Sequence, residues 1–242
     1  MQCVRMLCAS HRCVLNIRSA LASCRSPEKT LQFFRKDSVY CKRCSCSSVR
    51  KCWSCGSSAQ MFFCSSCNSI QPPQEKATYF EILNCDQTFA LDTRELQGKY
   101  VELQRSLHPD NFSQKSQTEQ RYSEEQSALI NKAYRTLQKP LTRSVYLLQL
   151  QGVELDEGTD ATADPALLLK VMDVNEKLAE TQSLDEVRAV GQEVQVTLKN
   201  LTEQMNTSLN KGDLKSAREL LVQMKYFANL EEKVKEKLRE NF

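Results

Sequence analysis

A proline between two amphipathic patterns constrains the fold of this 242-residue chain more than any other feature. Apolar residues recur at spacings of three and four from Leu96 to Leu107, and again from Ile130 to Leu137. That spacing places them on one face of a helix. Pro109 has no N–H and disfavours helical backbone in the residue before it, so the first helix should end near Leu107. We therefore predict an antiparallel helix pair with His108–Asp110 at its exposed tip.

The composition favours helices over strands. The chain contains only six Gly and six Pro, with 40% apolar and 26% charged residues. Such a chain can bury one or two modest cores and is not compositionally disordered. The longest apolar runs, such as Ala166–Leu169, are far too short to span a bilayer. We predict a mainly α fold with no membrane-spanning segment.

Residues 1–27 have the composition of a mitochondrial presequence. Four Arg and no acidic residue precede Glu28, among Ser, Ala, Leu, Val and Cys. A secretory signal requires an uninterrupted apolar core, which Arg12 and Arg18 break. We therefore expect a protein of the mitochondrial matrix, with a cytoplasmic pool left open. An untargeted basic tail is the alternative.

The net charge argues against a nucleic-acid partner. The formal charge of +3 comes from 33 basic and 30 acidic residues. Without the four Arg of residues 1–27, the remainder carries 29 minus 30, or −1. Nucleic-acid-binding domains normally keep a basic surface. The basic excess of this chain disappears with its presequence.

The cysteines are concentrated in one segment. Of twelve, four lie in residues 1–27, seven lie between Cys41 and Cys67, and Cys85 follows. Two C-x-x-C motifs, Cys52–Cys55 and Cys64–Cys67, are separated by eight residues. Two such motifs supply the four soft ligands of a tetrahedral zinc site, and four thiolates leave no open position. We predict a Cys-rich domain over residues 28–73, a small ribbon with Met61–Phe63 as its returning strand, that binds one structural zinc ion.

Other uses of these cysteines were weighed. Cys41, Cys44 and Cys46 form a third group that could supply ligands instead. A redox dithiol is less consistent with the sequence, because no βαβ pattern surrounds either motif. A catalytic zinc ion would need an open coordination position, and His108 is the sole histidine after the presequence.

Two N-terminal helix signals precede the helix pair. Thr78 and Glu81 have the spacing of a capping box, which predicts a short helix from Tyr79. Asp92 and Glu95 repeat that pattern before the helix that leads to His108. The order of a short helix, a longer helix, an exposed His-Pro-Asp turn and a third helix ending near Lys139 resembles the J-domain, here residues 74–152. A helix stop without function is the alternative for the triplet.

The J-domain resemblance implies a partner. J-domains activate the ATPase of heat-shock chaperones of the seventy-kilodalton class through this triplet. By that resemblance His108, Pro109 and Asp110 would dock on the chaperone, with Lys99 and Arg105 contributing basic charge from the preceding helix. Glu95 and Glu102 lie on the same helix, whereas J-domains usually show a more uniformly basic face there.

The segments beside and after the triplet restrict the resemblance to one family of J-domain proteins. Asn111 and Phe112 follow the triplet, and no Gly/Phe-rich linker follows the domain. With the two cysteine motifs, the Pro140–Leu148 segment and Met224–Phe227, the chain resembles the HscB family of iron-sulfur cluster co-chaperones in its animal mitochondrial form. The likeness covers nearly everything from Cys52 to Lys235.

The sequence of the C-terminal third predicts a helical bundle. Residues 153–163 contain four acidic residues and a glycine without an apolar period, which is typical of a linker. Asp164 and Pro165 suit the N-cap and first position of a helix. Ser183–Glu186 forms a capping box for a second helix, and Gly212 ends it before a third. An antiparallel three-helix bundle over residues 164–242 follows.

The first helix of this bundle carries apolar residues on two faces. The face expected toward the bundle carries Leu167, Val171, Val174 and Leu178, whereas Leu168, Leu169 and Met172 lie on the other side. Val222 and Tyr226 likewise point away from the apolar stripe of the third helix. Such a patch either binds a partner or packs against the J-domain. The family resemblance implies that it binds the iron-sulfur scaffold protein, through Leu168, Leu169, Met172, Asp173, Glu176 and Tyr226.

The expected function is that of an adaptor and not of an enzyme. By the resemblance, the bundle holds the scaffold, and the J-domain engages the chaperone, whose ATP hydrolysis transfers the scaffold to it. A zinc-ribbon nucleic-acid binder or general protein-interaction adaptor is the alternative. A metal-dependent enzyme is disfavoured because the His-Glu constellation of zinc hydrolases and deaminases is missing. Self-association is left open.

Overall fold

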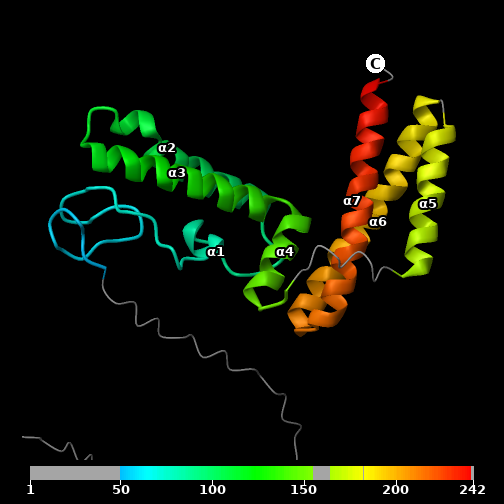
Figure 1. The fold of residues 1–242 in the computed structure, drawn as a ribbon, viewed down its shortest axis with the longest axis horizontal. Coiled ribbons are helices and arrows are strands. Elements are labelled where there is room, and N and C mark those ends of the chain that lie inside the picture. The colour runs from blue at the N-terminus through cyan, green and yellow to red at the C-terminus, as the bar shows by residue number, and fades with distance from the viewer. Residues whose placement is uncertain (1–49, 155–163, 182, 241–242) are drawn as a thin grey trace, which may run out of the picture. The chain divides into compact units, whose positions relative to one another are not determined.

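The computed structural model describes residues 50–154, 164–181 and 183–240. The predicted presequence, the alternative ligands Cys41, Cys44 and Cys46, and most of the predicted linker lie outside these residues. No helix in the described ranges is both long and apolar enough to cross a bilayer. The described part is mainly helical (Figure 1).

The helices of the first half follow the predicted order. Their bounds are Tyr79–Ile82 for α1, Thr93–Leu107 for α2, Pro109–Phe112 for the 3-10 turn η1, Gln117–Gln138 for α3 and Pro140–Leu150 for α4. The predicted capping box at α1 is confirmed: Thr78 accepts from the N–H of Glu81, whose carboxylate accepts from the N–H of Thr78. Asp92 caps α2 by accepting from Arg94 N and Glu95 N.

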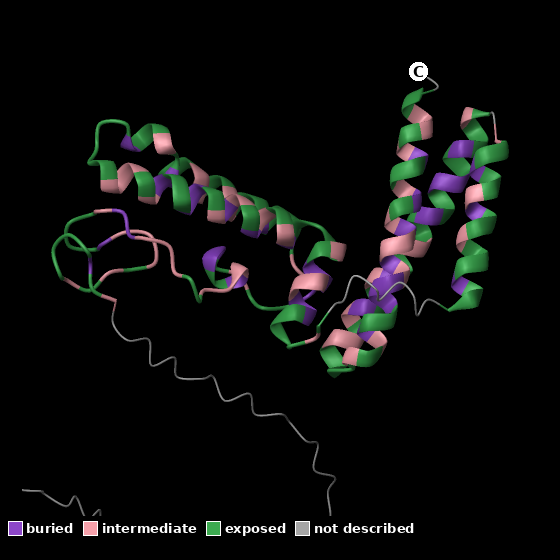
Figure 2. Ribbon diagram, in the orientation of Figure 1, coloured by how far each residue is buried: buried purple, intermediate pink, exposed green. Residues whose placement is uncertain are grey.

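Helices α2 and α3 form the predicted hairpin and pack along their apolar faces (Figure 2). Leu96, Leu107, Ile130 and Leu137 are almost completely buried. The rings of Tyr100 and Tyr134 stack with centroids 4.1 Å apart. The side chains at spacings of three and four therefore supply the contact between the two helices, as the pattern predicted.

Helix α4 was missing from the sequence-based description, which treated Pro140 only as the end of the third helix. Pro140 occupies the first position of α4, where its missing N–H has no cost. Arg143 then enters the core with 4% of its surface exposed. Its guanidinium donates to the carbonyls of Leu137 at 2.8 Å, Phe89 at 2.5 Å and Gln138 at 3.3 Å. Arg143 thus satisfies two carbonyls that the end of α3 leaves without helical partners.

The C-terminal bundle consists of α5 (Pro165–Glu180), α6 (Leu184–Lys211) and α7 (Leu214–Glu240). Asp164 caps α5 as predicted, accepting from Ala166 N at 3.1 Å. Ser183 is the N-cap residue of α6, but its side chain makes no capping hydrogen bond, so the predicted capping box is wrong. Gly212 ends α6 with a left-handed φ of 71°, a conformation that glycine adopts without a steric penalty.

The three bundle helices run up, down and up. Lys170 lies over the ring of Phe227 at 5.3 Å, and Lys233 Nζ donates to Asn175 Oδ1 at 2.8 Å. From the first contact to the second, the residue numbers increase on both helices. Helices α5 and α7 are therefore parallel, and α6 is antiparallel to both. Gly191 of α6 lets α7 approach closely, because a Cβ there would lie 3.0 Å from Val234 Cγ1.

The predicted inner face of α5 is confirmed, and one prediction for α7 is wrong. Leu167, Val174 and Leu178 are buried, and Val171 is half-buried against the core. Val222 was expected to point away from the core but is only 6% exposed. The sequence analysis assumed one buried face for α7. Leu220, Leu221 and Val222 are consecutive and all buried, so α7 is covered on more than one side.

The cysteine-rich segment is held by tight turns and not by strands. Its β pairing is limited to isolated bridges between Lys51 and Ser58, Ala59 and Cys64, and Phe63 and Ile70. The predicted returning strand at Met61–Phe63 is therefore reduced to a single bridged residue within the described ranges. The four-cysteine fold is nevertheless compact, because Ile70 is fully buried and Phe62 and Phe63 pack against the core.

Candidate functional site

The two C-x-x-C motifs fold into the same backbone turn twice. In the first, Gly56 N donates to Cys52 O at 3.0 Å and Cys52 N donates to Ser57 O at 2.7 Å. In the second, Asn68 N donates to Cys64 O at 2.9 Å and Cys64 N donates to Ser69 O at 3.0 Å. Gly56 and Asn68 both have positive φ, 75° and 56°. Asn, like Gly, is among the few residues that tolerate this conformation.

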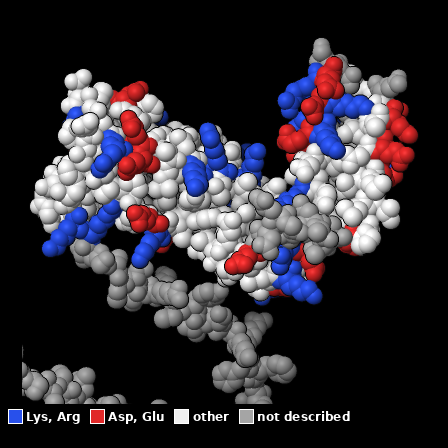
Figure 3. Space-filling model, in the orientation of Figure 1, with Lys and Arg blue, Asp and Glu red and all other residues white. Residues whose placement is uncertain are grey.

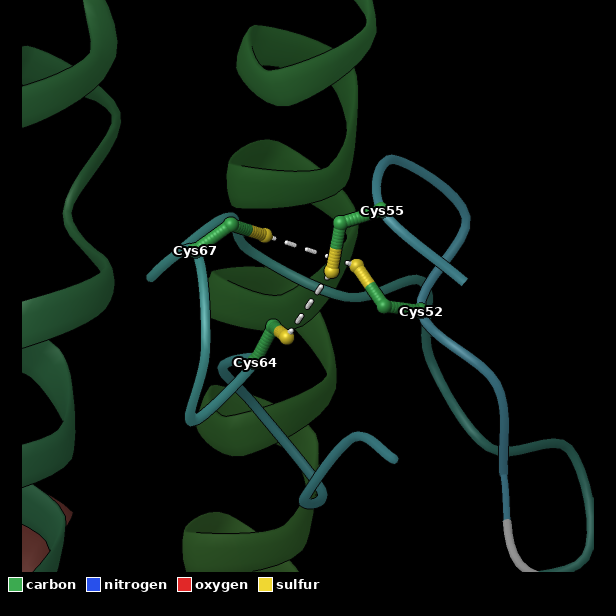
Figure 4. Close-up of side chains that lie close together, drawn as sticks. All are labelled: Cys52, Cys55, Cys64 and Cys67. Atoms are coloured by element: carbon green, nitrogen blue, oxygen red, sulfur yellow. Dashed lines mark hydrogen bonds between the residues drawn. The ribbon is translucent and has the colours of Figure 1, made fainter. Parts of the chain in front are cut away.

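The four predicted ligands converge (Figure 4). Their sulfur atoms all lie within 4.8 Å of one another. Cys52 Sγ is 3.7 Å from Cys67 Sγ, and Cys55 Sγ is 3.6 Å from Cys64 Sγ. In a tetrahedral site with Zn–S bonds of about 2.3 Å, sulfur atoms are about 3.8 Å apart. The donor set and its spacing therefore fit a four-coordinate metal ion.

Backbone and side-chain donors surround the sulfur atoms. Ser54 N and Ser66 N approach Cys52 Sγ and Cys64 Sγ, each at 3.4 Å. Although desolvation alone would raise the pKa of the Cys52 thiol, hydrogen bonds from backbone N–H groups and from Gln71 outweigh it and lower this pKa to about 6. At Cys52 these donors therefore favour the thiolate, which is the form that binds metals. At Cys64 the backbone N–H groups of Cys67 and Ser66 act in the same direction, but burial and the side-chain contacts with Cys55 and Cys67 outweigh them and raise the pKa.

Gln71 is a buried polar residue that the sequence analysis missed. Its Nε2 donates to Cys52 Sγ at 3.3 Å and to Ser69 O at 2.8 Å. Its Oε1 has no hydrogen-bond partner among the described residues. The amide is thus oriented with its donors toward the sulfur, at the cost of an unsatisfied oxygen. No local pattern marks Gln71, because its burial depends on contacts distant in sequence.

The His-Pro-Asp turn lies at the end of the helix pair. α2 ends at Leu107, and η1 follows with Pro109 in its first turn. The side chains of His108 and Asp110 are 53% and 89% exposed, and His108 Nδ1 lies 3.3 Å from Asp110 Oδ2. Phe112 is buried and anchors the turn to the hydrophobic core.

Asn111, which the sequence analysis named without giving it a structural role, fixes this turn. Asn111 Nδ2 donates to the backbone oxygen of Arg105 at 2.8 Å, which ties the turn to the last turn of α2. Asn111 directly follows the triplet in sequence, and this position was the available signal that its side chain could stabilise the turn. The turn is therefore a defined structure and not a loose loop.

The two predicted basic residues of α2 differ in their surroundings. Arg105 is exposed beside the turn. Lys99 Nζ lies 2.7 Å from Glu95 Oε1 and donates to Asn84 O at 2.6 Å. Glu95 raises the pKa of Lys99 by hydrogen bonding to it. Lys99 thus links α2 to the end of α1, while Arg105 is the basic group next to the triplet.

The outer face of α5 is apolar where it meets solvent. Leu168, Leu169 and Met172 are 39%, 67% and 64% exposed, and we call these three residues the α5 patch. The alternative that they pack against another part of the chain does not hold among the described residues. Exposed clusters of large apolar side chains commonly mark partner sites.

The remaining predicted residues lie on α5 and α7. Asp173 and Glu176 are exposed on α5, and Asp173 Oδ2 pairs with Lys177 Nζ at 3.0 Å. Tyr226 is half-buried on α7 next to Phe227, whose ring Lys170 covers. An apolar centre with acidic groups at its edge has the composition of a protein-binding surface.

Charges of both signs are interspersed over the visible face of the molecule (Figure 3). Several pairs neutralise each other locally, including Arg121 with Glu125 at 3.7 Å and Arg188 with Asp185 at 2.9 Å. This mixed surface differs from the continuous basic face on which nucleic-acid binding depends.

Comparison with known families assigns both halves of the chain. Residues 78–146 match the DnaJ domain. With its exposed His-Pro-Asp turn on a helical hairpin, the chain is therefore a J-domain co-chaperone. Residues 163–235 match the HSCB C-terminal oligomerisation domain.

Relatives that match most of the chain identify its family within the class of J-domain co-chaperones. The iron-sulfur cluster co-chaperone protein HscB of Mus musculus is 46% identical over 190 residues, which cover 76% of this chain and 81% of that protein. The protein of the same name from Homo sapiens is 41% identical over 194 residues, covering 78% and 83%. The chain belongs to the HscB family of iron-sulfur cluster co-chaperones, which is not an enzyme family.

Solved structures agree with this assignment. The crystal structure of human co-chaperone protein HscB superposes with a TM-score of 0.73 at 41% identity, covering 78% of this chain and 98% of that one. Chaperone HscB from Vibrio cholerae gives a TM-score of 0.63 at 29% identity, covering 69% and 100%. The predicted fold class is thereby confirmed.

Proposed function

We propose that this chain binds an iron-sulfur cluster scaffold protein and delivers it to a mitochondrial heat-shock chaperone of the seventy-kilodalton class, whose ATPase it stimulates. The observation that carries this proposal is the presence of two exposed surfaces of different chemistry on one chain. One is the charged turn at His108–Asp110, and the other is the apolar α5 patch. An adaptor needs one surface for each partner.

The turn is proposed to be the chaperone-docking site. His108 and Asp110 are exposed while Leu107 and Phe112 on either side are buried. A docking group held on buried anchors loses little conformational entropy when it binds. Pro109 limits the backbone further, and Arg105 adds a positive charge beside the triplet. Lys99 would contribute mainly by holding α2 in place.

The α5 patch, with Asp173, Glu176 and Tyr226, is proposed to be the scaffold-binding site. Leu169 and Met172 are about two-thirds exposed, so a partner can remove much apolar surface from water there. The acidic residues at its edge would select a partner with basic groups. The mouse and human relatives are iron-sulfur cluster co-chaperones, which supports a cluster scaffold as this partner.

Delivery follows from holding both partners at once. A scaffold bound to the bundle and a chaperone bound to the turn are present at a raised effective concentration, which favours their encounter without any contact of their own. Chaperone hydrolysis of ATP then supplies the energy for the transfer. This chain contributes binding and orientation and no chemistry.

We propose that Cys52, Cys55, Cys64 and Cys67 bind one structural zinc ion. Four thiolates at tetrahedral spacing complete the coordination of Zn²⁺, so no position stays open for a substrate. The proposed location is the mitochondrial matrix, because residues 1–27 contain four Arg and no acid.

The test is steady-state ATP hydrolysis by the mitochondrial chaperone with scaffold protein present. We expect the chain without residues 1–27 to stimulate hydrolysis, and the His108→Gln variant to stimulate it less than about a tenth as well. Lys132→Gln, a change at an exposed residue of α3, is the matched control and should retain full stimulation. Equal stimulation by both variants would exclude the turn as trigger.

A further inference from the structure

The cysteine cluster is packed directly on the helix hairpin. Trp53, inside the first C-x-x-C motif, donates from Nε1 to Ile70 O at 2.6 Å. Its ring meets Tyr122 of α3 edge to face, with centroids 5.7 Å apart. Ile70 is fully buried in the same apolar core as Leu107 and Ile130. The cluster and the hairpin therefore share a core.

A chain of buried hydrogen bonds also connects them. The side-chain Nε2 of Gln71 donates to Cys52 Sγ at 3.3 Å, and Gln126 Nε2 of α3 donates to the backbone carbonyl oxygen of Gln71 at 2.9 Å. Gln71 and Gln126 are 0% and 1% exposed. The two bonds hold Gln71 at its side chain and at its backbone, and the loss of either leaves a buried donor or acceptor unsatisfied. The position of Cys52 Sγ is thus tied to the position of α3.

The same part of α3 holds the end of α2. Ser123 Oγ, one residue from Tyr122, donates to Leu107 O at 2.7 Å in a buried position. Leu107 directly precedes His108. Tyr122, Ser123 and Gln126 lie within about one helical turn, so α3 contacts the cysteine cluster and the end of α2 over the same short segment. Few contacts separate Cys52 from His108.

We infer that metal binding at the four cysteines is coupled, through Gln71 and Gln126, to the order of the His-Pro-Asp turn. Without a metal ion, four close sulfur atoms lose the charge that holds them together. Gln71 then loses a fixed acceptor, and Trp53 loses its support against Tyr122. The Tyr122–Gln126 segment is released on one side, which loosens the contact to Leu107. The metal ion is thus part of what fixes the trigger and not only a staple of its own segment.

Coupling of this kind is reciprocal. If the metal ion stabilises the hairpin, then the hairpin must raise the affinity for the metal ion by the same factor. Weakening the relay at Gln126 should therefore weaken metal binding, although Gln126 touches no cysteine in the described structure. This reciprocity gives two readouts that do not depend on chaperone activity.

The inference rests on the proposed zinc site and trigger, and hydrogen exchange tests it separately from both. The chain is compared with zinc bound and after chelation, as wild type, as Gln126→Met and as Gln138→Met. Gln138→Met makes the same change at an exposed residue at the far end of α3. In the wild type and control, chelation should speed exchange in residues 105–112 and 122–126 about tenfold. In Gln126→Met this metal dependence should shrink, and competition with a chelator should show several-fold weaker zinc binding.

Three results are distinguishable. Faster exchange confined to residues 50–71 after chelation, in a chain shown to bind zinc, would overturn the coupling and leave the proposed function intact. A chain with no bound zinc would overturn the zinc proposal and the coupling together. Coupled exchange in a chain that fails to stimulate the chaperone would support the inference and count against the proposed function. Circular dichroism of Gln126→Met checks that the variant keeps its helices.

Discussion

The hydroxyl of Ser123 lies 2.7 Å from the carbonyl oxygen of Leu107, to which it donates a buried hydrogen bond across the helix hairpin. Leu107 is the last residue of α2, so its carbonyl has no helical partner. The bond fixes the point at which the chain leaves α2 and enters the exposed turn. A single hydroxyl thereby links the interior of the hairpin to the exposed turn at its end.

Ser123→Ala should lower the free energy of unfolding by about 1–3 kcal/mol, because the Leu107 carbonyl stays buried without a partner. Urea denaturation measures this. The control is Ser106→Ala, which removes an exposed hydroxyl on α2 that donates to Leu103 O. That change should cost less than about 0.5 kcal/mol, since alanine favours helix and water replaces the lost bond. Equal losses of unfolding free energy would show that the buried hydrogen bond contributes no more stability than the exposed one.

Arg143→Met should destabilise the fold by about 3 kcal/mol or more. The guanidinium is buried and donates to three backbone carbonyls, so the substitution leaves these acceptors in the core. Desolvation lowers the pKa of Arg143, but the group stays charged at any physiological pH. Thermal and urea denaturation supply the comparison.

Arg188→Met is the control for that experiment. Arg188 is exposed, and its pair among the described residues is Asp185 on the same helix, within one turn. Exposed pairs of this kind contribute about 0–1 kcal/mol. A loss at Arg143 no larger than at Arg188 would contradict the role assigned to the buried guanidinium.

Cys52→Ser and Cys64→Ser should each abolish stoichiometric zinc binding, measured as metal content after dialysis. A serine hydroxyl is a poor ligand for Zn²⁺ compared with a thiolate. Cys85→Ser should retain one zinc ion per chain, because Cys85 is half-buried and separate from the cluster. Retention of zinc by the Cys52 and Cys64 variants would instead implicate Cys41, Cys44 and Cys46.

Met172→Ala should weaken scaffold binding about ten- to hundredfold without lowering stability. The side chain is 64% exposed, so truncation costs little in the free chain, whereas it removes apolar area from the complex. Titration calorimetry with the scaffold protein gives the affinity. Val196→Ala on α6, where the side chain is 59% exposed, is the matched control. Similar affinities for the two variants would place the binding surface elsewhere.

The sequence was sufficient where local chemistry decides the structure. Pro109 ended α2 at Leu107, Thr78 and Asp164 capped their helices, and the two C-x-x-C motifs met as ligands because each motif forms its own turn. These features depend on neighbours within about four residues. The same holds for the exposed α5 patch, where helical periodicity alone separated the inner and outer faces.

Features that depend on distant contacts were not predicted. The sequence analysis predicted no helix after the third one, because nothing near Pro140 indicates that Arg143 will be buried against Phe89. Val222 seemed exposed because one buried face was assumed for α7. Gln71 and Gln126 resemble surface glutamines in sequence, and only the folded chain gives them a structural role, with Gln71 bonded to Cys52 and Gln126 bonded to the backbone of Gln71. Long-range packing overrides local preference in each case.

The burial of the four cysteines alternates within the two motifs, and this sets how a metal ion would leave. Cys52 and Cys64 are buried, whereas Cys55 and Cys67 are exposed. One hemisphere of a bound ion would therefore face the protein and the other would face water. An incoming thiol or chelator would replace Cys55 or Cys67 first, while the two inner sulfur atoms keep their hold. Exchange of the ion would then proceed stepwise from the open side, with a half-released intermediate, and would not require the chain to unfold.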